Sequence, residues 1–257
     1  MSDAPKIIDP AASALFLDVD GTLLEICDTP SEVRADEQLI GLLRSCYEKL
    51  GGALALVSGR SVPEVDRIFS PDLFPVAGAH GAEIRADGRQ VMSVVNNPLP
   101  DFAIAALESF ASRHDGLLLE RKRGGASLHY RLAPDLEEQS RRLVTDLLRD
   151  LGDAYRLIAG KKVFEIAPAA HSKGAAIEWF LENPPYQNRT PVFIGDDVTD
   201  EDGFIVVNRL SGTSIRVGED GQTAATQFLP DTTSVREWLQ SAVLNNHTRQ
   251  TKGMNPT

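Results

Sequence analysis

Cysteine and basic residues are both scarce in this chain. Its 257 residues include 2 cysteines, Cys27 and Cys46, and 26 Lys and Arg against 37 Asp and Glu, which gives a formal net charge of −11. Two cysteines make neither a disulfide framework nor a metal-ligand pattern, so we expect reduced thiols. The acidic balance argues against nucleic-acid binding through a basic surface, although it leaves room for a local positive pocket.

Long apolar runs are also missing. No segment approaches the ~20 consecutive apolar residues that a membrane-spanning helix needs. The opening Met-Ser-Asp-Ala-Pro lacks the basic and then apolar pattern of a secretory signal. We therefore expect a cytoplasmic protein with no membrane partner. Hydrophobic residues still make up 42% of the chain, enough for a large core, and the length suggests one large domain or two unequal ones.

Apolar strands alternate with amphipathic helices toward both ends of the chain. The predicted elements are a strand at 14–17, a helix at 36–50, a strand at 53–57, and later a helix at 173–181, strands at 191–194 and 213–217, and a helix at 234–244. Continuous apolar strands separated by helices are typical of an α/β fold with a doubly wound, mainly parallel sheet.

The middle of the chain has a different pattern. Proline-containing stretches at 96–100 and 168–170 read as linkers. Between them we predict helices at 101–112 and 135–151 and strands near 117–122, 126–131, 154–158 and 162–166. The sequence therefore predicts a core domain made of residues 1–98 and 169–257, with an inserted α+β cap domain at 99–168.

Two acidic clusters follow predicted buried strands, Asp18 with Asp20 and Asp196 with its neighbour. Open parallel sheets bind ligands at the carboxyl ends of their strands, and neither spacing fits an EF-hand loop. Both clusters can converge on an oxygen-preferring cation such as Mg²⁺. Ser58, at another strand end, offers a hydroxyl, and Lys173 begins a helix whose dipole favours anions. These are the parts needed for phosphoryl transfer through an aspartyl-phosphate.

The chain resembles the haloacid dehalogenase superfamily, whose four sequence motifs match Asp18-Val19-Asp20-Gly21-Thr22, Ser58, Lys173 and Gly195-Asp196-Asp197. Within that superfamily it is similar to the trehalose-6-phosphate phosphatase family, through residues 56–60, 78–83, 128–131, 160–166 and 195–201. One departure lies at 167–173, Ala-Pro-Ala-Ala-His-Ser-Lys, where the family usually carries a basic residue and a glycine around the proline.

The resemblance implies a division of roles among the motif residues. Asp18 would be the nucleophile and Asp20 the general acid and base. Ser58 and Lys173 would hold the phosphate oxygens. Mg²⁺ would be bound by Asp18, the backbone carbonyl of Asp20 and Asp196, with Asp197 and Asp200 in the outer shell. We assign no role to Arg60, which is expected at most to pair with a local carboxylate.

Substrate selection is expected from the inserted domain. Period-2 alternation places Glu120 with Lys122, and His129 with Arg131, on shared strand faces. Such charged faces are usually solvated. The resemblance instead implies that the sugar is bound by Lys161, Glu165, Arg131, Lys122 and His80. It implies a hydrolase of carbohydrate metabolism that releases trehalose and phosphate from trehalose 6-phosphate, the last step of trehalose biosynthesis.

Several other functions remain open from the residues. One is a related capped phosphatase for sucrose phosphate or mannosylphosphoglycerate, and a phosphomutase is another. A receiver-like phospho-accepting module shares the aspartate, acidic pair, hydroxyl and lysine. However, it lacks a cap and a second aspartate two residues after the acceptor, which Asp20 provides here. A non-catalytic sugar-phosphate sensor would not need Asp18, Asp20, Lys173 and Asp196 together.

Overall fold

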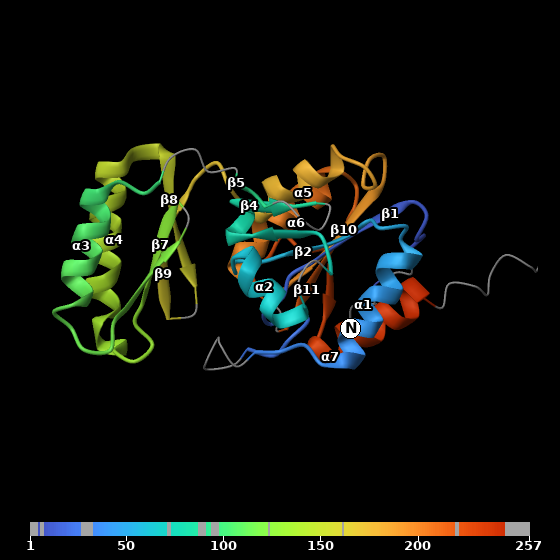
Figure 1. Cartoon of the computed structure of the whole chain (residues 1–257), viewed down its shortest axis with the longest axis horizontal. Helices are drawn as coiled ribbons and strands as arrows, with labels where there is room; N and C mark the ends of the chain where they lie inside the picture. The colour runs from blue at the N-terminus through green and yellow to red at the C-terminus, as the bar shows by residue number, and fades with distance from the viewer. Residues whose placement is uncertain are drawn as a thin grey trace, which may run out of the picture.

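The protein folds into two lobes, each built on its own sheet (Figure 1). This computed structural model describes residues 5, 8–26, 33–70, 73–86, 91–93, 98–122, 124–160, 162–218 and 221–244. The larger lobe contains an 8-stranded sheet and the smaller lobe a 4-stranded sheet. Within the described residues, no helix combines the length and the apolar character needed to cross a bilayer.

The larger sheet has the order β12-β11-β10-β1-β2-β3-β4-β5. Its strands are β1 (Ser13–Leu17), β2 (Leu54–Val57), β3 (Val76–Gly78), β4 (Glu83–Arg85), β5 (Met92–Ser93), β10 (Thr190–Gly195), β11 (Thr213–Val217) and β12 (Gln227–Leu229). All neighbours from β12 to β3 pair in parallel, and β4 and β5 extend the sheet antiparallel. Parallel strand β1 therefore lies between β2 and β10, with its carboxyl end at the same edge as theirs.

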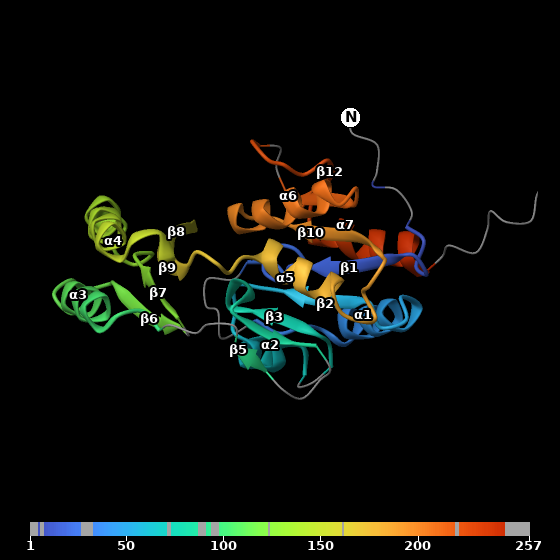
Figure 2. The ribbon, with the colours of Figure 1, turned by 90° about the horizontal axis from the view of Figure 1, so that it is seen from above.

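Helices cover both faces of this sheet (Figure 2). One face packs against α1 (Glu37–Lys49), α2 (Val62–Phe69), α7 (Thr232–Trp238) and the π-helical turn at Leu239–Leu244. The other packs against α5 (Lys173–Leu181) and α6 (Glu201–Arg209). Alternate β1 residues serve the two faces: Leu15 and Leu17 join the first core, whereas Ala14 and Phe16 join the second. Burial on both faces explains the continuous apolar run.

The predicted α/β fold with a doubly wound, mainly parallel sheet is confirmed. Several smaller elements differ from the sequence predictions. Helix α6 and the short strands β3, β4, β5 and β12 were not predicted, and the last helix begins at Thr232 and becomes π-helical at Leu239. Strands of two or three residues contain too few positions to display a period.

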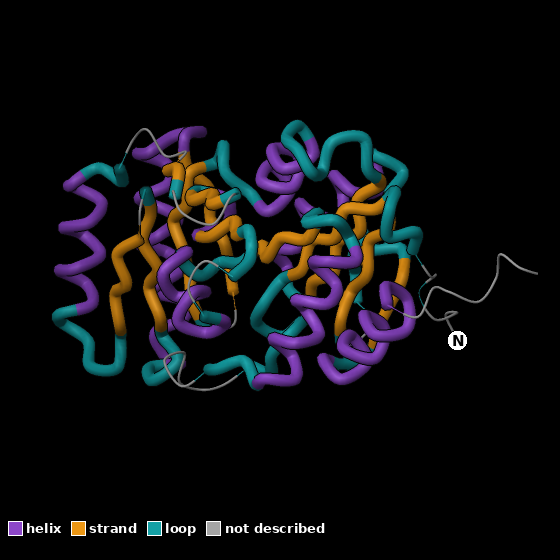
Figure 3. Tube along the Cα trace, turned by 45° about the vertical axis from the view of Figure 1, so that its right-hand side comes forward, coloured by secondary structure: helices purple, strands orange, loops and turns teal. Residues whose placement is uncertain are grey.

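The smaller lobe holds the antiparallel sheet β6-β7-β9-β8. Its strands are β6 (Leu118–Lys122), β7 (Gly125–His129), β8 (Tyr155–Gly160) and β9 (Val163–Pro168), and its helices are α3 (Asp101–Ala111) and α4 (Glu137–Leu151). Both helices cover the face that is turned away from the larger lobe (Figures 1 and 3). The opposite face of the sheet is turned toward the larger lobe.

Candidate active site

The motif residues meet at the carboxyl edge of the larger sheet. Asp18 directly follows β1, Ser58 follows β2 and Asp196 follows β10, while Lys173 is the first residue of α5. Because β1 is paired in parallel with both β2 and β10, these strand ends lie side by side. All four residues, together with Asp20, line a cleft of about 280 Å³. The structure therefore brings together residues that are far apart in the sequence.

Lys173 lies at the centre of this group. Its Nζ donates to Asp18 Oδ1 at 2.6 Å and to Asp200 Oδ1 at 2.7 Å. The capping hydroxyl of Ser172 accepts from the Ala175 N–H, which fixes the first turn of α5 and hence the lysine. Burial by itself lowers the pKa of Lys173, but the two carboxylates outweigh burial and raise that pKa. The lysine is therefore a cation at neutral pH.

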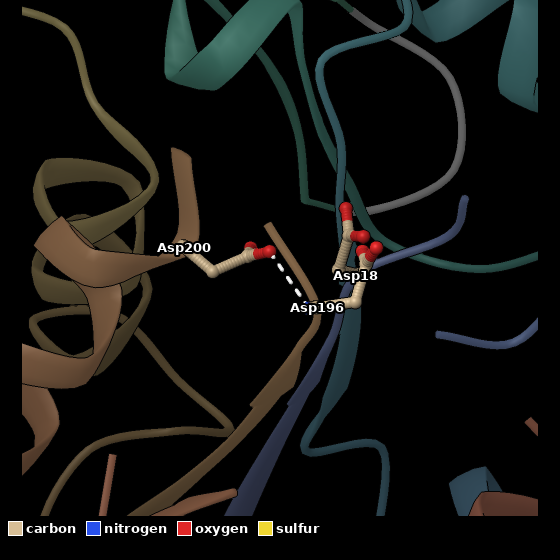
Figure 4. A group of neighbouring side chains, drawn as sticks. All are labelled: Asp18, Asp196 and Asp200. Carbon is tan, nitrogen blue, oxygen red and sulfur yellow. Dashed lines mark hydrogen bonds between the residues drawn. The ribbon is translucent and has the colours of Figure 1, made fainter. Parts of the chain in front are cut away.

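Asp200 ties the second acidic cluster to the first. Its Oδ2 accepts from the backbone N–H groups of Asp196 at 3.0 Å and Asp197 at 2.9 Å. Figure 4 shows Asp200 bonded to the backbone of Asp196, whose carboxylate lies beside that of Asp18. Gly195 makes room for this arrangement, because a Cβ there would lie 2.3 Å from Asp200 Cγ. The family resemblance implies an outer-shell position for Asp200, and its bond to Lys173 emerges only from the structure.

The donor set at this edge suits a divalent cation. Oxygen atoms of Asp18, Asp196 and Asp200 lie within 4.8 Å of one another. With all three carboxylates ionised, the single lysine would leave two negative charges uncompensated, and a divalent ion would balance them. Burial raises the pKa of Asp18, and Asp200 and Asp196 act in the same direction against Lys173. Hard oxygen ligands of this kind fit Mg²⁺, and a bound cation would favour ionised Asp18.

Gly21 allows the two acidic segments to approach. It has a φ of +82°, and a Cβ at this position would lie 2.1 Å from Asp196 Oδ2. Any side chain would therefore collide with the carboxylate and strain the backbone. The glycine of the Asp-Val-Asp-Gly-Thr segment is thus part of the site rather than of a simple turn.

Asp20 is held by a residue to which the sequence analysis assigned no role. Arg60 Nε donates to Asp20 Oδ2 and Arg60 Nη2 donates to Asp20 Oδ1, both at 2.6 Å. The backbone N–H of Arg60 also donates to Ser58 Oγ at 3.1 Å. Sequence spacing could have suggested Arg60, because it follows the same strand end as Ser58, but its partner 40 residues away could not be read from spacing.

Glu165, on β9, gathers groups from both lobes. Its Oε2 accepts from Lys122 Nζ at 2.6 Å and from Ser127 Oγ at 2.8 Å, and it lies 3.7 Å from His80 Nε2 of the larger lobe. Burial alone raises the pKa of Glu165, but Lys122 and His80 outweigh burial and lower that pKa. The carboxylate therefore stays charged beside the cleft.

His80 reaches Glu165 from an unusual backbone position. Its φ is +54°, in the left-handed region, within the 3-10 turn Ala79–Gly81. Gly59 lies beneath the imidazole ring, and a Cβ there would be 2.6 Å from His80 Cε1. This glycine allows the buried ring to lie between the two lobes and line the cleft.

The remaining cap-side residues divide into three groups. Arg131 lines the same cleft as Lys122 and Glu165. Lys161 lies outside the described residues. Glu120 and His129 also line the cleft and pair at 2.9 Å. A hydrogen bond from His129 lowers the pKa of Glu120. The sequence pattern predicts that Glu120 shares a strand face with Lys122 and His129 with Arg131, and it assigns no role to Glu120 or His129.

The sequence matches a family model described as trehalose-phosphatase over residues 16–233. It is 43% identical over 205 residues to a probable trehalose-phosphate phosphatase of Sinorhizobium fredii, a match that covers 80% of this chain and 77% of that protein. It is 40% identical over 245 residues to a trehalose-6-phosphate phosphatase of Escherichia coli, covering 93% and 89% respectively.

Solved structures with the same fold agree with these sequence matches. The crystal structure of a trehalose-6-phosphate phosphatase related protein matches with a TM-score of 0.73 and 28% identity, covering 93% of this chain and 100% of that one. A phosphatase of the HAD enzyme superfamily from Bacteroides thetaiotaomicron matches with a TM-score of 0.59 at 16% identity, covering 91% and 96%, a likeness of fold alone. The predicted haloacid dehalogenase-like fold is confirmed.

Proposed function

The chain belongs to the trehalose-phosphatase family, and from that premise we propose that it hydrolyses trehalose 6-phosphate to trehalose and inorganic phosphate, the last step of trehalose biosynthesis. The observation that carries the proposal is the single cleft that Asp18, Ser58 and Lys173 share with the charged face of the smaller sheet. Phosphate chemistry and sugar recognition then occupy one space. The enzyme is a phosphoric monoester hydrolase whose substrate is a small sugar phosphate.

The reaction would run in two displacements at phosphorus. Asp18 Oδ attacks the phosphorus atom as the bond from phosphorus to the sugar oxygen breaks, and Asp20 gives that oxygen a proton. Water then attacks the aspartyl-phosphate, Asp20 takes a proton from the water, and Asp18 leaves as a carboxylate. Ser58 and Lys173 hold the non-bridging oxygens in both steps.

Mg²⁺ is the cation we propose for the site. Asp18, Asp196 and the backbone carbonyl of Asp20 would hold it, and Asp197 and Asp200 would support them from outside. When bound, the ion offsets the negative charge that repels a carboxylate from a phosphate. Asp200 already orders the backbone of Asp196 and Asp197 through the two hydrogen bonds to its Oδ2.

Selection of the sugar is proposed for the smaller lobe, residues 99–168, acting as a cap on a core of residues 1–98 and 169–257. Lys122, Arg131, Glu165 and His80 present both donors and acceptors to the cleft, and Lys161 is proposed to add another donor. Sugar hydroxyls need such mixed partners. A sugar that leaves the buried Glu165 and His80 unpaired would be rejected because unpaired buried polar groups are costly.

The experiment is phosphate release from a panel of sugar phosphates with Mg²⁺ or with EDTA. The panel contains trehalose 6-phosphate, sucrose phosphate and mannosylphosphoglycerate. We expect release from the first alone, loss of it in EDTA, and a fall in rate of at least ~10³-fold in Asp18→Asn. A matched control is Asp153→Asn, which changes an exposed aspartate in the smaller lobe and should leave the rate unchanged.

Other outcomes identify the alternatives. Metal-dependent release from a different ester would overturn the substrate assignment and keep the mechanism. A requirement for a sugar bisphosphate would indicate a mutase. A stable phosphoprotein, or tight sugar-phosphate binding with no turnover, would indicate a phospho-accepting module or a sensor and overturn the enzyme assignment.

A further inference from the structure

We propose that Arg60 is a positioning residue that aims the Asp20 carboxylate at the leaving oxygen of the substrate. The two side chains form a two-pronged pair in which each carboxylate oxygen accepts one hydrogen bond of 2.6 Å. A pair of this kind fixes direction as well as distance, because the guanidinium is planar and its donors have a fixed spacing. This inference rests on the proposed phosphatase function.

Asp20 needs an external support. Its side chain is 33% exposed, whereas that of Arg60 is 12% exposed. The aspartate lies just past β1 in a turn closed by a hydrogen bond from Gly21 N–H to the Leu24 carbonyl at 2.7 Å. That bond fixes the backbone and leaves the side-chain torsions unconstrained. The two hydrogen bonds from the Arg60 guanidinium therefore restrain the Asp20 side chain, which the turn does not.

The backbone of Arg60 is held by hydrogen bonds at both its N–H and its carbonyl group. Its N–H donates to Ser58 Oγ at 3.1 Å, and its carbonyl accepts from the Ala79 N–H at 2.7 Å. Gly78 packs directly on that carbonyl, since a Cβ there would lie 2.9 Å from the oxygen. The backbone of Arg60 is thus held in register with Ser58, which we place against the phosphate. Arg60 links the phosphate-holding hydroxyl to the acid.

The paired hydrogen bonds from Arg60 are also compatible with both proton transfers by Asp20. In the first step the protonated oxygen of Asp20 must turn to the sugar oxygen while the bond from that oxygen to phosphorus breaks. In the second step the same carboxylate must take a proton from water. If one oxygen keeps its bond to Arg60, the carboxylate pivots about that bond and stays within reach for both transfers. Correct aim matters because proton transfer needs hydrogen-bond contact.

The test compares two esters in the first turnover, followed as release of the leaving alcohol. Trehalose 6-phosphate needs a proton on its leaving oxygen, whereas p-nitrophenyl phosphate does not. For Arg60→Gln we expect a fall of ~10²-fold or more with trehalose 6-phosphate, in the range of general acid catalysis, and a change below ~3-fold with p-nitrophenyl phosphate. Asp20→Asn should show the same split, and the double variant should be no slower than Asp20→Asn.

Two further variants separate aim from folding. Arg60→Lys keeps one donor and should recover part of the rate with trehalose 6-phosphate. Arg142→Gln removes an exposed guanidinium that pairs with Glu138 at 3.0 Å and should change neither rate. Each variant is checked for an unchanged melting temperature before its rates are compared.

Four results would overturn the inference. Equal losses on both esters, or a double variant whose losses multiply, would mean that Arg60 contacts the phosphate directly. An unchanged rate in Arg60→Gln would mean that Asp20 needs no support. If the wild type cleaves another sugar phosphate instead of trehalose 6-phosphate, only the substrate assignment fails, and that sugar ester takes its place in the comparison. If it cleaves no ester, both proposals fail.

Discussion

Lys173 is a full positive charge in a place that water hardly reaches. Its side chain is 3% exposed, and those of its partners Asp18 and Asp200 are 5% and 0% exposed. Burying any one of these ions alone costs several kcal/mol, so the three are stable only together. Loss of Lys173 would therefore leave two buried carboxylates without their cation, which costs stability.

Lys173→Met should destabilise the metal-free protein by about 3–5 kcal/mol at pH 7, because two buried carboxylates lose their cation. Burial already raises the pKa of Asp18, and removing Lys173 raises it further. When the folded-state pKa of an acid is raised, the folded protein binds more protons than the unfolded chain. The variant should therefore regain stability as the pH is lowered from 7 to 5. In the wild type, the two carboxylates raise the pKa of Lys173 above its unfolded value of about 10.4. The stabilisation from protonated Lys173 is therefore complete below this unfolded pKa and is lost as the pH rises through the folded pKa.

Urea unfolding in EDTA at several pH values measures this effect. The control is Lys162→Met, whose side chain is 50% exposed and lies 3.5 Å from Glu137. That exposed pair should contribute less than about 1 kcal/mol, with no such trend with pH. An equal loss at every pH in Lys173→Met would show that the carboxylates do not carry the effect.

The sequence predicts which residues meet where the strand topology alone brings them together. Asp18, Ser58 and Asp196 each follow a parallel strand, so their meeting follows from topology. The partners of Asp20 and Asp200 did not follow from topology, because a side chain's rotamer depends on everything packed around it. Arg60 and the bond between Asp200 and Lys173 could therefore be found only in the structure.

At the scale of the element, the two faces of strand β6 have different surroundings. Lys122 points to the cleft and donates to Glu165 at 2.6 Å. Its neighbour Arg121 has a 61% exposed side chain that pairs with Glu108 of α3. Alternation along a strand therefore separates a side chain that lines the cleft from an exposed one by a single residue.

Lys122→Met should lower kcat/KM for trehalose 6-phosphate by ~10- to 100-fold, because Glu165 loses its charged partner and the sugar loses a donor. The same change should leave p-nitrophenyl phosphate nearly unaffected, since that ester lacks a sugar. Arg121→Met is the matched control and should behave as the wild type with both esters. Equal losses on both esters would place Lys122 in the phosphate chemistry rather than in sugar recognition.

Long periodic elements were predictable, and short ones were not. Helix α4 was predicted at 135–151 and runs from Glu137 to Leu151, because apolar residues recur along one of its faces. Helix α6 was missed because Glu201–Arg209 follows directly on an acidic cluster that reads as a loop. The antiparallel strands β4 and β5 were missed because they are three and two residues long.

At the scale of the whole molecule, polar contacts join the two lobes at separate points. Arg156 of β8 donates to Asp202 of α6 at 2.7 Å and to the His171 carbonyl at 3.2 Å. Glu165 approaches His80 at 3.7 Å on the cleft side. These contacts between described residues are polar, as expected for lobes that separate and rejoin. Hinges are expected at residues 97–100 and 167–170, but Ala167 and Pro168 pair with β8 as part of β9, and Asn97 lies outside the described residues. The proposed hinges are therefore residues 98–100 and 169–170.

We expect the lobes to open in the free enzyme and close on a ligand. Small-angle scattering should give a smaller radius of gyration with orthovanadate and Mg²⁺ than without them. Arg156→Met removes the link to Asp202 and should enlarge the free enzyme, whereas Arg142→Gln should not. Equal scattering curves in the two states of the wild type would contradict opening and closing.

The pairing of β1 with β10 affects the order in which the two sheets fold. Residues 13–17 form the centre of the larger sheet, yet their neighbour on one side is residues 190–194. The antiparallel sheet of the smaller lobe closes over much shorter stretches of chain, and local pairing forms faster than distant pairing. On a ribosome, the apolar strand at residues 13–17 must wait until residues 190–194 have emerged. Chaperones that shield exposed apolar segments would matter most during that interval.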